Sequence, residues 1–272
     1  MITHQIRSEV LLTGAVALLF ALPAQAQLAK PNEAGVSFAH VHLNVADIEV
    51  HKKLWVDHFD GVVVVKGPLT TVKFPGMLLV FTEREPTGPS EGSGVDHFGF
   101  KVKNLAEVLA KWREADLQVH SEFTGGEGTD NAFLIAPDGA KIEVQEDTTL
   151  EVKAEAYHVH LFSQGPVELL DWYIDKFSAV KRARGIHQNT ADVPGMNLSF
   201  ENRRERAPTQ GRAIDHIGFE VENLEAFCKA LEEQGVELQM GYRNIPVIEA
   251  AIAFFIDPSG VRIELTEGLD KY

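Results

Sequence analysis

Histidine and glutamate residues recur at matching positions in the two halves of this 272-residue chain. The spacing is 118 residues from His40 to His158, 119 from His97 to His216, and 121 from Glu143 to Glu264. Two imidazoles and one carboxylate on a common face can hold a divalent metal while leaving coordination positions open. A substrate with adjacent oxygens can then chelate the ion and become polarised.

Each of these residues also has an ordinary explanation when it is taken alone. A single strand histidine is more often a packed core or pocket residue, and a single glutamate at a strand end is usually a surface charge. The recurrence of the whole set favours metal binding. We predict one ion in each half, bound by His40, His97 and Glu143 in the first and by His158, His216 and Glu264 in the second. Such donors accept Fe²⁺, Mn²⁺, Ni²⁺ or Zn²⁺ without sharp selection.

Two further histidines, His42 and His160, stand two residues after the first predicted ligands. Alternate residues of a strand share a face, so both side chains should enter the same cleft. Imidazole titrates near neutrality, which makes them candidate acid–base catalysts, although they could equally line the pocket. Asp96 and Asp215 precede predicted ligands, and strand alternation predicts that their side chains face away.

The histidines and glutamates belong to a longer internal repeat. Three motifs recur: Ala39-His-Val-His-Leu43 as Tyr157-His-Val-His-Leu161, Asp96-His-Phe-Gly-Phe100 as Asp215-His-Ile-Gly-Phe219, and Ala136-Pro-Asp-Gly-Ala-Lys-Ile-Glu143 as Asp257-Pro-Ser-Gly-Val-Arg-Ile-Glu264. Three motifs that shift by nearly one period indicate a duplication. The mature chain should therefore contain two domains, residues 27–150 and 151–272.

Each half divides again into two units of the same element order. Residues 38–45 alternate as in a strand, 47–59 carry the apolar stripe of a helix, and short strands follow at 61–66, 71–74 and 77–82. The same order returns with helices predicted at 105–115, 166–177 and 224–234. Four β-α-β-β-β modules paired into two tandem domains make an α+β fold.

These motifs resemble the vicinal oxygen chelate superfamily, which includes glyoxalase I, bleomycin-resistance proteins, methylmalonyl-CoA epimerase and extradiol dioxygenases. The resemblance rests on His-x-x-Leu-x-Val at 40–45, on Asp-His-x-Gly-Phe and on Pro-Asp-Gly-x-Lys-Ile-Glu, and it extends over nearly all of the mature chain. It implies paired modules that form a cleft around one metal. It also implies ligands on the first strand of each module and on the last strand of each pair, where the six residues stand.

The sequence departs from particular members of the superfamily. Glyoxalase I-like proteins use a fourth ligand, usually a glutamate, which by resemblance falls near Val80 in the first half and Ser199 in the second. In the second half, Glu201 lies on the same strand face as Ser199 and could supply the carboxylate. In the first half, the equivalent position has only Thr82. Extradiol dioxygenases are similar in having three ligands but carry a pocket tyrosine where this chain has Phe133 and Phe254. The ligand count slightly favours dioxygenase-like chemistry over a lyase or isomerase. The alternative is a non-catalytic protein that sequesters a small ligand.

The N-terminal residues 1–26 have the pattern of a secretory signal peptide, with Arg7, an apolar run from Val10 to Leu22 and Ala24-Gln-Ala26 as the cleavage site. The apolar run is too short to span a bilayer, and we predict a periplasmic or secreted protein. The formal net charge of −15 argues against nucleic acid and anionic lipid as partners. The partner that we expect is a small-molecule substrate that chelates the metal. The one cysteine, Cys228, is predicted to be a buried thiol. The sequence gives no indication of the oligomeric state.

Overall fold

A computed structural model describes residues 28–272, so the predicted signal peptide lies outside the described residues. The four predicted β-α-β-β-β modules are present. Module 1 has β1 (Val36–Val45), α1 (Ile48–Phe59), β2 (Val62–Lys66), β3 (Leu69–Phe74) and β4 (Met77–Glu83). Module 2 has β5 (Val95–Val102), α2 (Leu105–Glu114), β6 (Gln118–Thr124), β7 (Asp130–Ile135) and β8 (Lys141–Glu146).

The second half of the chain repeats the pattern with small additions. Module 3 has β9 (Ala154–Ser163), α3 (Pro166–Phe177), β10 (Val180–Lys181), β11 (Thr190–Val193) and β12 (Met196–Asn202). Module 4 has β13 (Ile214–Val221), α4 (Leu224–Glu233), β14 (Leu238–Ile245), β15 (Ala250–Ile256) and β16 (Arg262–Glu267), with 3₁₀ turns η1 (Pro246–Ile248) and η2 (Leu269–Lys271). No helix among residues 28–272 is long and apolar enough to cross a membrane.

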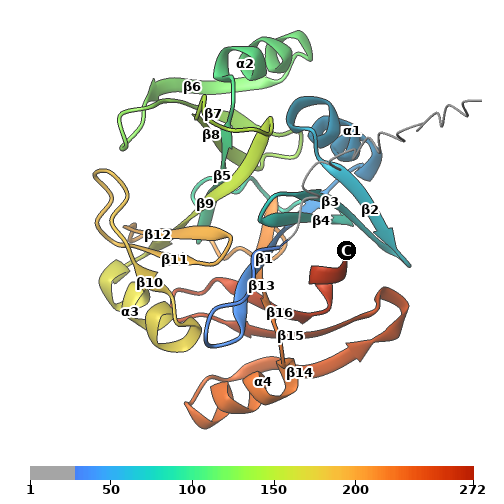
Figure 1. Ribbon diagram of the computed structural model, residues 1–272, viewed down its shortest axis with the longest axis vertical. Helices are drawn as coiled ribbons and strands as arrows, with labels where there is room; N and C mark the ends of the chain where they lie inside the picture. The colour runs from blue at the N-terminus through green and yellow to red at the C-terminus, as the bar shows by residue number, and fades with distance from the viewer. Residues whose placement is uncertain (1–27) are drawn as a thin grey trace, which may run out of the picture.

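The strands form two eight-stranded sheets, and each sheet takes one module from each half of the sequence. Sheet I has the order β14-β15-β16-β13-β1-β4-β3-β2 and combines modules 1 and 4. Sheet II has the order β10-β11-β12-β9-β5-β8-β7-β6 and combines modules 2 and 3. Figure 1 shows blue β1 beside orange β13, and green β5 beside yellow-green β9.

The boundary predicted near residue 150 does fall between modules, but it does not separate two self-contained sheets. Antiparallel pairing of β1 with β13, and of β5 with β9, joins strands from opposite halves at the centre of each sheet. Within its own module, the first strand pairs on one side only, so its other edge could pair with the first strand of any other module. A duplicated sequence therefore does not determine which two modules pair.

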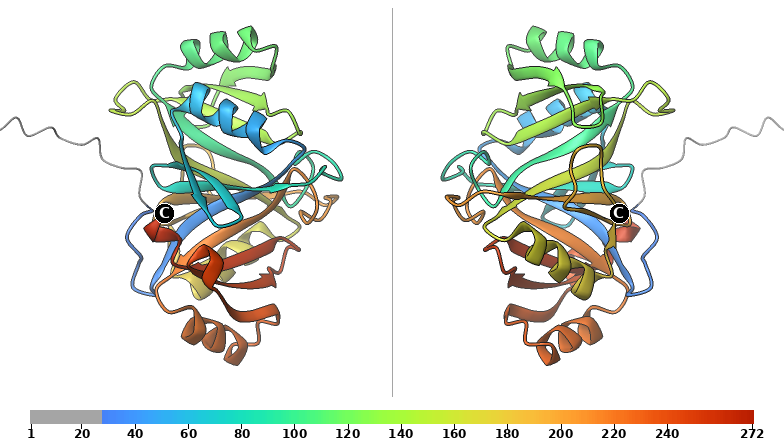
Figure 2. Two further views of the ribbon diagram at one scale, coloured as in Figure 1. Left: turned by 90° about the vertical axis from the view of Figure 1, so that its right-hand side faces the viewer. Right: turned by 90° about the vertical axis from the view of Figure 1, so that its left-hand side faces the viewer.

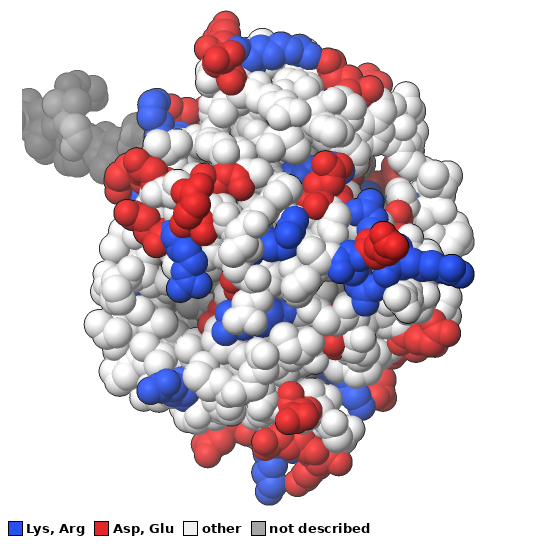
Figure 3. Space-filling model, turned by 180° about the vertical axis from the view of Figure 1, so that it is seen from behind, with Lys and Arg blue, Asp and Glu red and all other residues white. Residues whose placement is uncertain are grey.

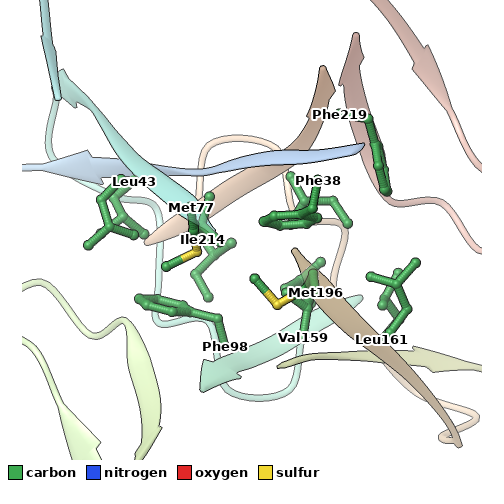
Figure 4. Close-up of a cluster of buried hydrophobic side chains, with 14 of the residues drawn as sticks. Phe38, Leu43, Met77, Phe98, Val159, Leu161, Met196, Ile214 and Phe219 are labelled. Carbon is green, nitrogen blue, oxygen red and sulfur yellow. The ribbon is translucent and has the colours of Figure 1, made fainter. Parts of the chain in front are cut away.

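The faces of the two sheets that turn toward each other bury one hydrophobic core. Figure 4 shows Phe38, Met77 and Ile214 of sheet I opposite Phe98 and Met196 of sheet II. Helices α2 and α4 lie at opposite ends of the molecule (Figure 2). Acidic groups are scattered among Lys and Arg over the face in Figure 3, as expected for an acidic surface.

Candidate metal centres

The donor side chains of sheet I converge at one place, which we call site 1. It consists of His40 and His42 on β1, His216 on β13 and Glu264 on β16. The Nε2 atoms of His40 and His216 lie 3.0 and 2.8 Å from Glu264 Oε2. One potential ligand atom from each of the four residues lies within 4.8 Å of the others. His40, His216 and Glu264 are buried, and His42 is partly exposed.

Sheet II builds the equivalent site 2. It consists of His97 on β5, Glu143 on β8, and His158 and His160 on β9. The Nε2 atoms of His97 and His158 lie 3.1 and 3.0 Å from Glu143 Oε2. The four donors are buried and again lie within 4.8 Å of one another.

The structure brings all six predicted metal ligands into such clusters, but the predicted division between halves is wrong. His40 meets His216 and Glu264 rather than His97 and Glu143, because β1 pairs with β13 in sheet I. In the same way His158 joins His97 and Glu143 in sheet II. Each site therefore takes ligands from both halves of the sequence.

A glycine in each Asp-His-x-Gly-Phe motif makes room for a ligand ring. Gly218 lies between His40 and Glu264 in the sheet register, and Gly99 lies between His158 and Glu143. A Cβ at either glycine would overlap the neighbouring imidazole. The motif thus has glycine because the ligand histidine of the adjacent strand covers that position.

The two aspartates before His97 and His216 hold those imidazoles in place, contrary to the expectation that they face away. Asp96 Oδ1 lies 2.8 Å from His97 Nδ1, and Asp215 Oδ1 lies 2.6 Å from His216 Nδ1. The strand register shifts at both aspartates, which is a β-bulge that re-aims a side chain. A carboxylate on Nδ1 leaves Nε2 directed at the ion, as in many metal sites.

The electrostatics of both sites fit a cation. Burial opposes ionisation, but the facing histidines outweigh it and hold the pKa values of Glu143 and Glu264 well below their usual range. Burial also disfavours protonated His97 and His216, yet their hydrogen bonds to carboxylates raise the pKa of each above 6.5. Burial lowers the pKa of His158 to about 4. A buried carboxylate facing two imidazoles is what a bound divalent ion would neutralise.

The spacing of the donor atoms fits an ion as well. Ligand atoms about 2.1 Å from a metal and at right angles to one another lie about 3.0 Å apart. The four measured nitrogen–oxygen separations in the two sites range from 2.8 to 3.1 Å. Two imidazoles and the carboxylate of each site could therefore hold an octahedral ion with little movement.

Part of the sequence is similar to a known protein superfamily. The sequence pattern of the Glyoxalase/Bleomycin resistance protein/Dioxygenase superfamily matches residues 157–265. The match covers most of the second half of the chain. The matched segment runs from β9 to β16 and includes four of the eight donors: His158, His160, His216 and Glu264. None of the curated proteins compared with the chain matches its sequence.

Solved structures have a similar fold over most of the chain. Glyoxalase I from Zea mays superposes with a TM-score of 0.66 at 16% identity, over 87% of this chain and 94% of that one. A putative dioxygenase from Bacillus subtilis superposes with a TM-score of 0.65 at 12% identity, over 89% and 86%. This likeness supports the predicted α+β fold of four β-α-β-β-β modules, although the modules pair across the two halves of the sequence.

The fourth candidate donor of each cluster is a histidine rather than a residue of β4 or β12. The structure adds His42 to site 1 and His160 to site 2, where the sequence suggested acid–base or pocket roles. His42 Nε2 lies 2.8 Å from Thr82 Oγ1, whereas Arg184 donates to His160 Nε2 over 2.8 Å. Phe133 and Phe254 pack edge-on against His97 and His216.

Four other histidines, His51, His58, His120 and His187, lie outside the donor sets. His51 binds Asp138 and His58 packs on Trp112, both on helix α1. His187 lies nearer to the chemistry, since its Nδ1 is 2.8 Å from Glu201 and its ring faces His160. Cys228 is buried on α4, as predicted.

Replacing Asp96 with Asn should weaken metal binding at site 2 by about 10- to 100-fold, because the amide no longer fixes and polarises His97. Asp215→Asn should do the same at site 1. Titration of the metal-free protein with Mn²⁺ or Zn²⁺ measures both constants. Asp175→Asn, on the exposed face of α3, is the matched control. Unchanged affinity in D96N and D215N would contradict the orienting role.

Proposed function

We propose that the protein is a metal-dependent enzyme that acts on a small organic substrate with two adjacent oxygens. The observation that supports this most is the convergence of two imidazoles and one carboxylate, from separate strands, at each of two sites. A divalent ion held there would supply Lewis acidity, polarising the chelated oxygens and stabilising negative charge that develops on them.

Site 2 is the better candidate for chemistry that needs a co-substrate. Because Arg184 donates to His160 Nε2, this nitrogen is engaged, and three donors remain: His97, His158 and Glu143. Two histidines and one carboxylate on one face leave room for a chelating substrate and for a small third ligand. That supports a dioxygenase-like reaction slightly over a lyase or isomerase reaction.

His160 is our proposed proton-transfer residue in site 2. Burial, reinforced by the nearby His97, holds the pKa of His160 well below 6.5, so the ring is neutral near pH 7. Arginine only donates hydrogen bonds, so Nε2 of His160 accepts and the ring proton lies on Nδ1. Once released from Arg184, Nε2 can take a proton from a substrate bound beside it. His42 has the equivalent place in site 1.

Metal content and oxygen consumption test the proposal. Protein purified from metal-supplemented medium should contain near-stoichiometric metal, and the Fe²⁺-loaded form should consume oxygen with at least one catechol. Metal-bearing protein without oxygen consumption would favour a lyase or isomerase. Protein without metal would favour the second candidate, a binder of small molecules related to bleomycin-resistance proteins. Glu143→Gln removes the carboxylate of site 2, so any activity that arises from site 2 should be lost in this variant.

We also propose that residues 1–26 direct export and are removed, so that the mature protein works in the periplasm or outside the cell. The support is the sequence pattern around Arg7 and Ala26 alone. N-terminal sequencing of the protein from the cell fraction that contains it should begin near Gln27. A retained Met1 in the cytoplasmic fraction would contradict export.

A further inference from the structure

We propose that Arg184 makes site 2 selective for substrates with a carboxylate beside the chelating oxygen, such as 2-oxo- or 2-hydroxycarboxylates. This inference rests on the proposed metal-dependent function and names the substrate class of one of its two sites. It predicts that sites 1 and 2 take chemically different ligands despite their common donors.

Arg184 is a buried cation that borders the donor cluster. It lies in the segment between β10 and β11, and its side chain is only 3% exposed. Nη2 donates to His160 Nε2 over 2.8 Å and to Ser199 Oγ over 3.3 Å. Because His160 belongs to the cluster whose ligand atoms lie within 4.8 Å, the guanidinium borders the place where an ion would bind.

The hydrogen-bonding capacity of this guanidinium is not used up. Its one carboxylate contact is long, 3.3 Å from Nη1 to Glu127 Oε2, and Glu127 also accepts from Tyr157. The buried Nε atom has no hydrogen-bond partner. Guanidinium groups bind carboxylates with two parallel hydrogen bonds, and a buried donor without a partner is costly. An incoming carboxylate would satisfy Nε and an adjacent Nη together.

The segment that carries Arg184 is held over site 2. Arg184 and His187 exchange backbone hydrogen bonds of 2.9 Å, and Ile186 N donates to Gly126 O over 3.0 Å. Gly185 packs so closely on Gly126 that a Cβ would meet its backbone. Arg184 is therefore positioned before a ligand arrives, which lowers the entropy lost on binding.

The corresponding positions beside site 1 are apolar, whereas those beside site 2 are polar. Beside the β9 histidines, β12 places Asn197 and Ser199 in register, whereas β4 places Leu78 and Val80 beside His40 and His42. Leu78 and Val80 belong to an apolar cluster that also buries Leu269 and Tyr272. Within residues 28–272, no arginine or lysine hydrogen-bonds to a donor of site 1. Near site 1, the partly exposed Arg262 contacts Asp215 rather than a metal donor. Among the described residues, only site 2 thus has a buried arginine that hydrogen-bonds directly to one of its candidate donors.

The test uses calorimetric titration of full-length protein carrying His216→Ala, in which only site 2 is expected to retain Mn²⁺. Oxalate serves as the chelating carboxylate, and catechol chelates through two hydroxyl oxygens without a carboxylate. Arg184→Gln should weaken oxalate binding by about 10- to 100-fold and leave catechol binding within about twofold. Arg184→Lys keeps the positive charge but cannot make two parallel hydrogen bonds, so it should weaken oxalate binding several-fold. Arg182→Gln, which removes an exposed arginine paired with Asp192, is the matched control and should change neither constant.

Metal content, measured before and after titration, separates this inference from the proposed function. Absence of Mn²⁺ from the parent protein would overturn the proposed function. Bound Mn²⁺ with equal oxalate affinity in the parent, R184Q and R184K proteins would overturn the role of Arg184 alone. Equal losses of oxalate and catechol affinity would also overturn it, since they would reveal general damage to the site.

Discussion

A protein with Gly218→Ala should lose the metal of site 1 and keep the metal of site 2. The added Cβ would overlap the His40 imidazole, which has β-sheet backbone beneath it and core strands beside it. The ring must therefore swing away from Glu264, and one of the three converging donors leaves the site. Overpacking of this kind should also lower the free energy of unfolding by about 1–3 kcal/mol.

Gly241→Ala is the matched control, because Gly241 also lies in sheet I but has no atoms near its Cβ position. Elemental analysis and urea unfolding of both variants measure the two effects. Gly99→Ala should act in the same way on His158 and site 2. If G218A bound as much metal as G241A, then the close packing of His40 on Gly218 would not be needed for the site.

Much of this fold could be predicted from the sequence because local patterns determine it. The helix expected at residues 166–177 is the observed α3, with Pro166 in its first turn. The helices expected at 105–115 and 224–234 end one residue earlier, at Glu114 and Glu233. Apolar periodicity and turn residues act within a module, so each β-α-β-β-β unit could be recognised by itself.

The pairing of modules could not be predicted in the same way. It depends on contacts between strands far apart in the sequence, and β5 could in principle have paired with β1 instead of β9. It also involves packing between the two sheets, whose shared core includes Phe38, Phe98 and Met196. The sequence prediction therefore exchanged the partners of His40 and His158, although all six predicted ligands lie in the two clusters.

Two further features of the sites escaped sequence analysis for separate physical reasons. Asp96 and Asp215 reach their histidines because a β-bulge breaks the alternation on which the prediction rested. Arg184 lies in a segment without a counterpart in module 1, so the repeat gave no signal. The equal spacing of the Asp-His-x-Gly-Phe motifs did contain a signal for Gly99 and Gly218, because only glycine tolerates an imidazole above it.

The second large effect concerns pairs of histidines. Replacing two histidines of one site should remove no more bound metal than replacing one of them, because a site that has lost one ligand is already empty. Two changes in different sites should empty both. His97→Ala with His158→Ala removes donors from opposite halves of the sequence but from one site, whereas His40→Ala with His97→Ala removes donors from one half but from both sites.

Metal content of these two double variants, measured by elemental analysis after equal loading, tests the sharing of ligands between halves most directly. We predict about one ion per chain in H97A/H158A and almost none in H40A/H97A. The reverse result, with the ion retained in H40A/H97A and lost from H97A/H158A, would show that each half of the sequence binds its own metal.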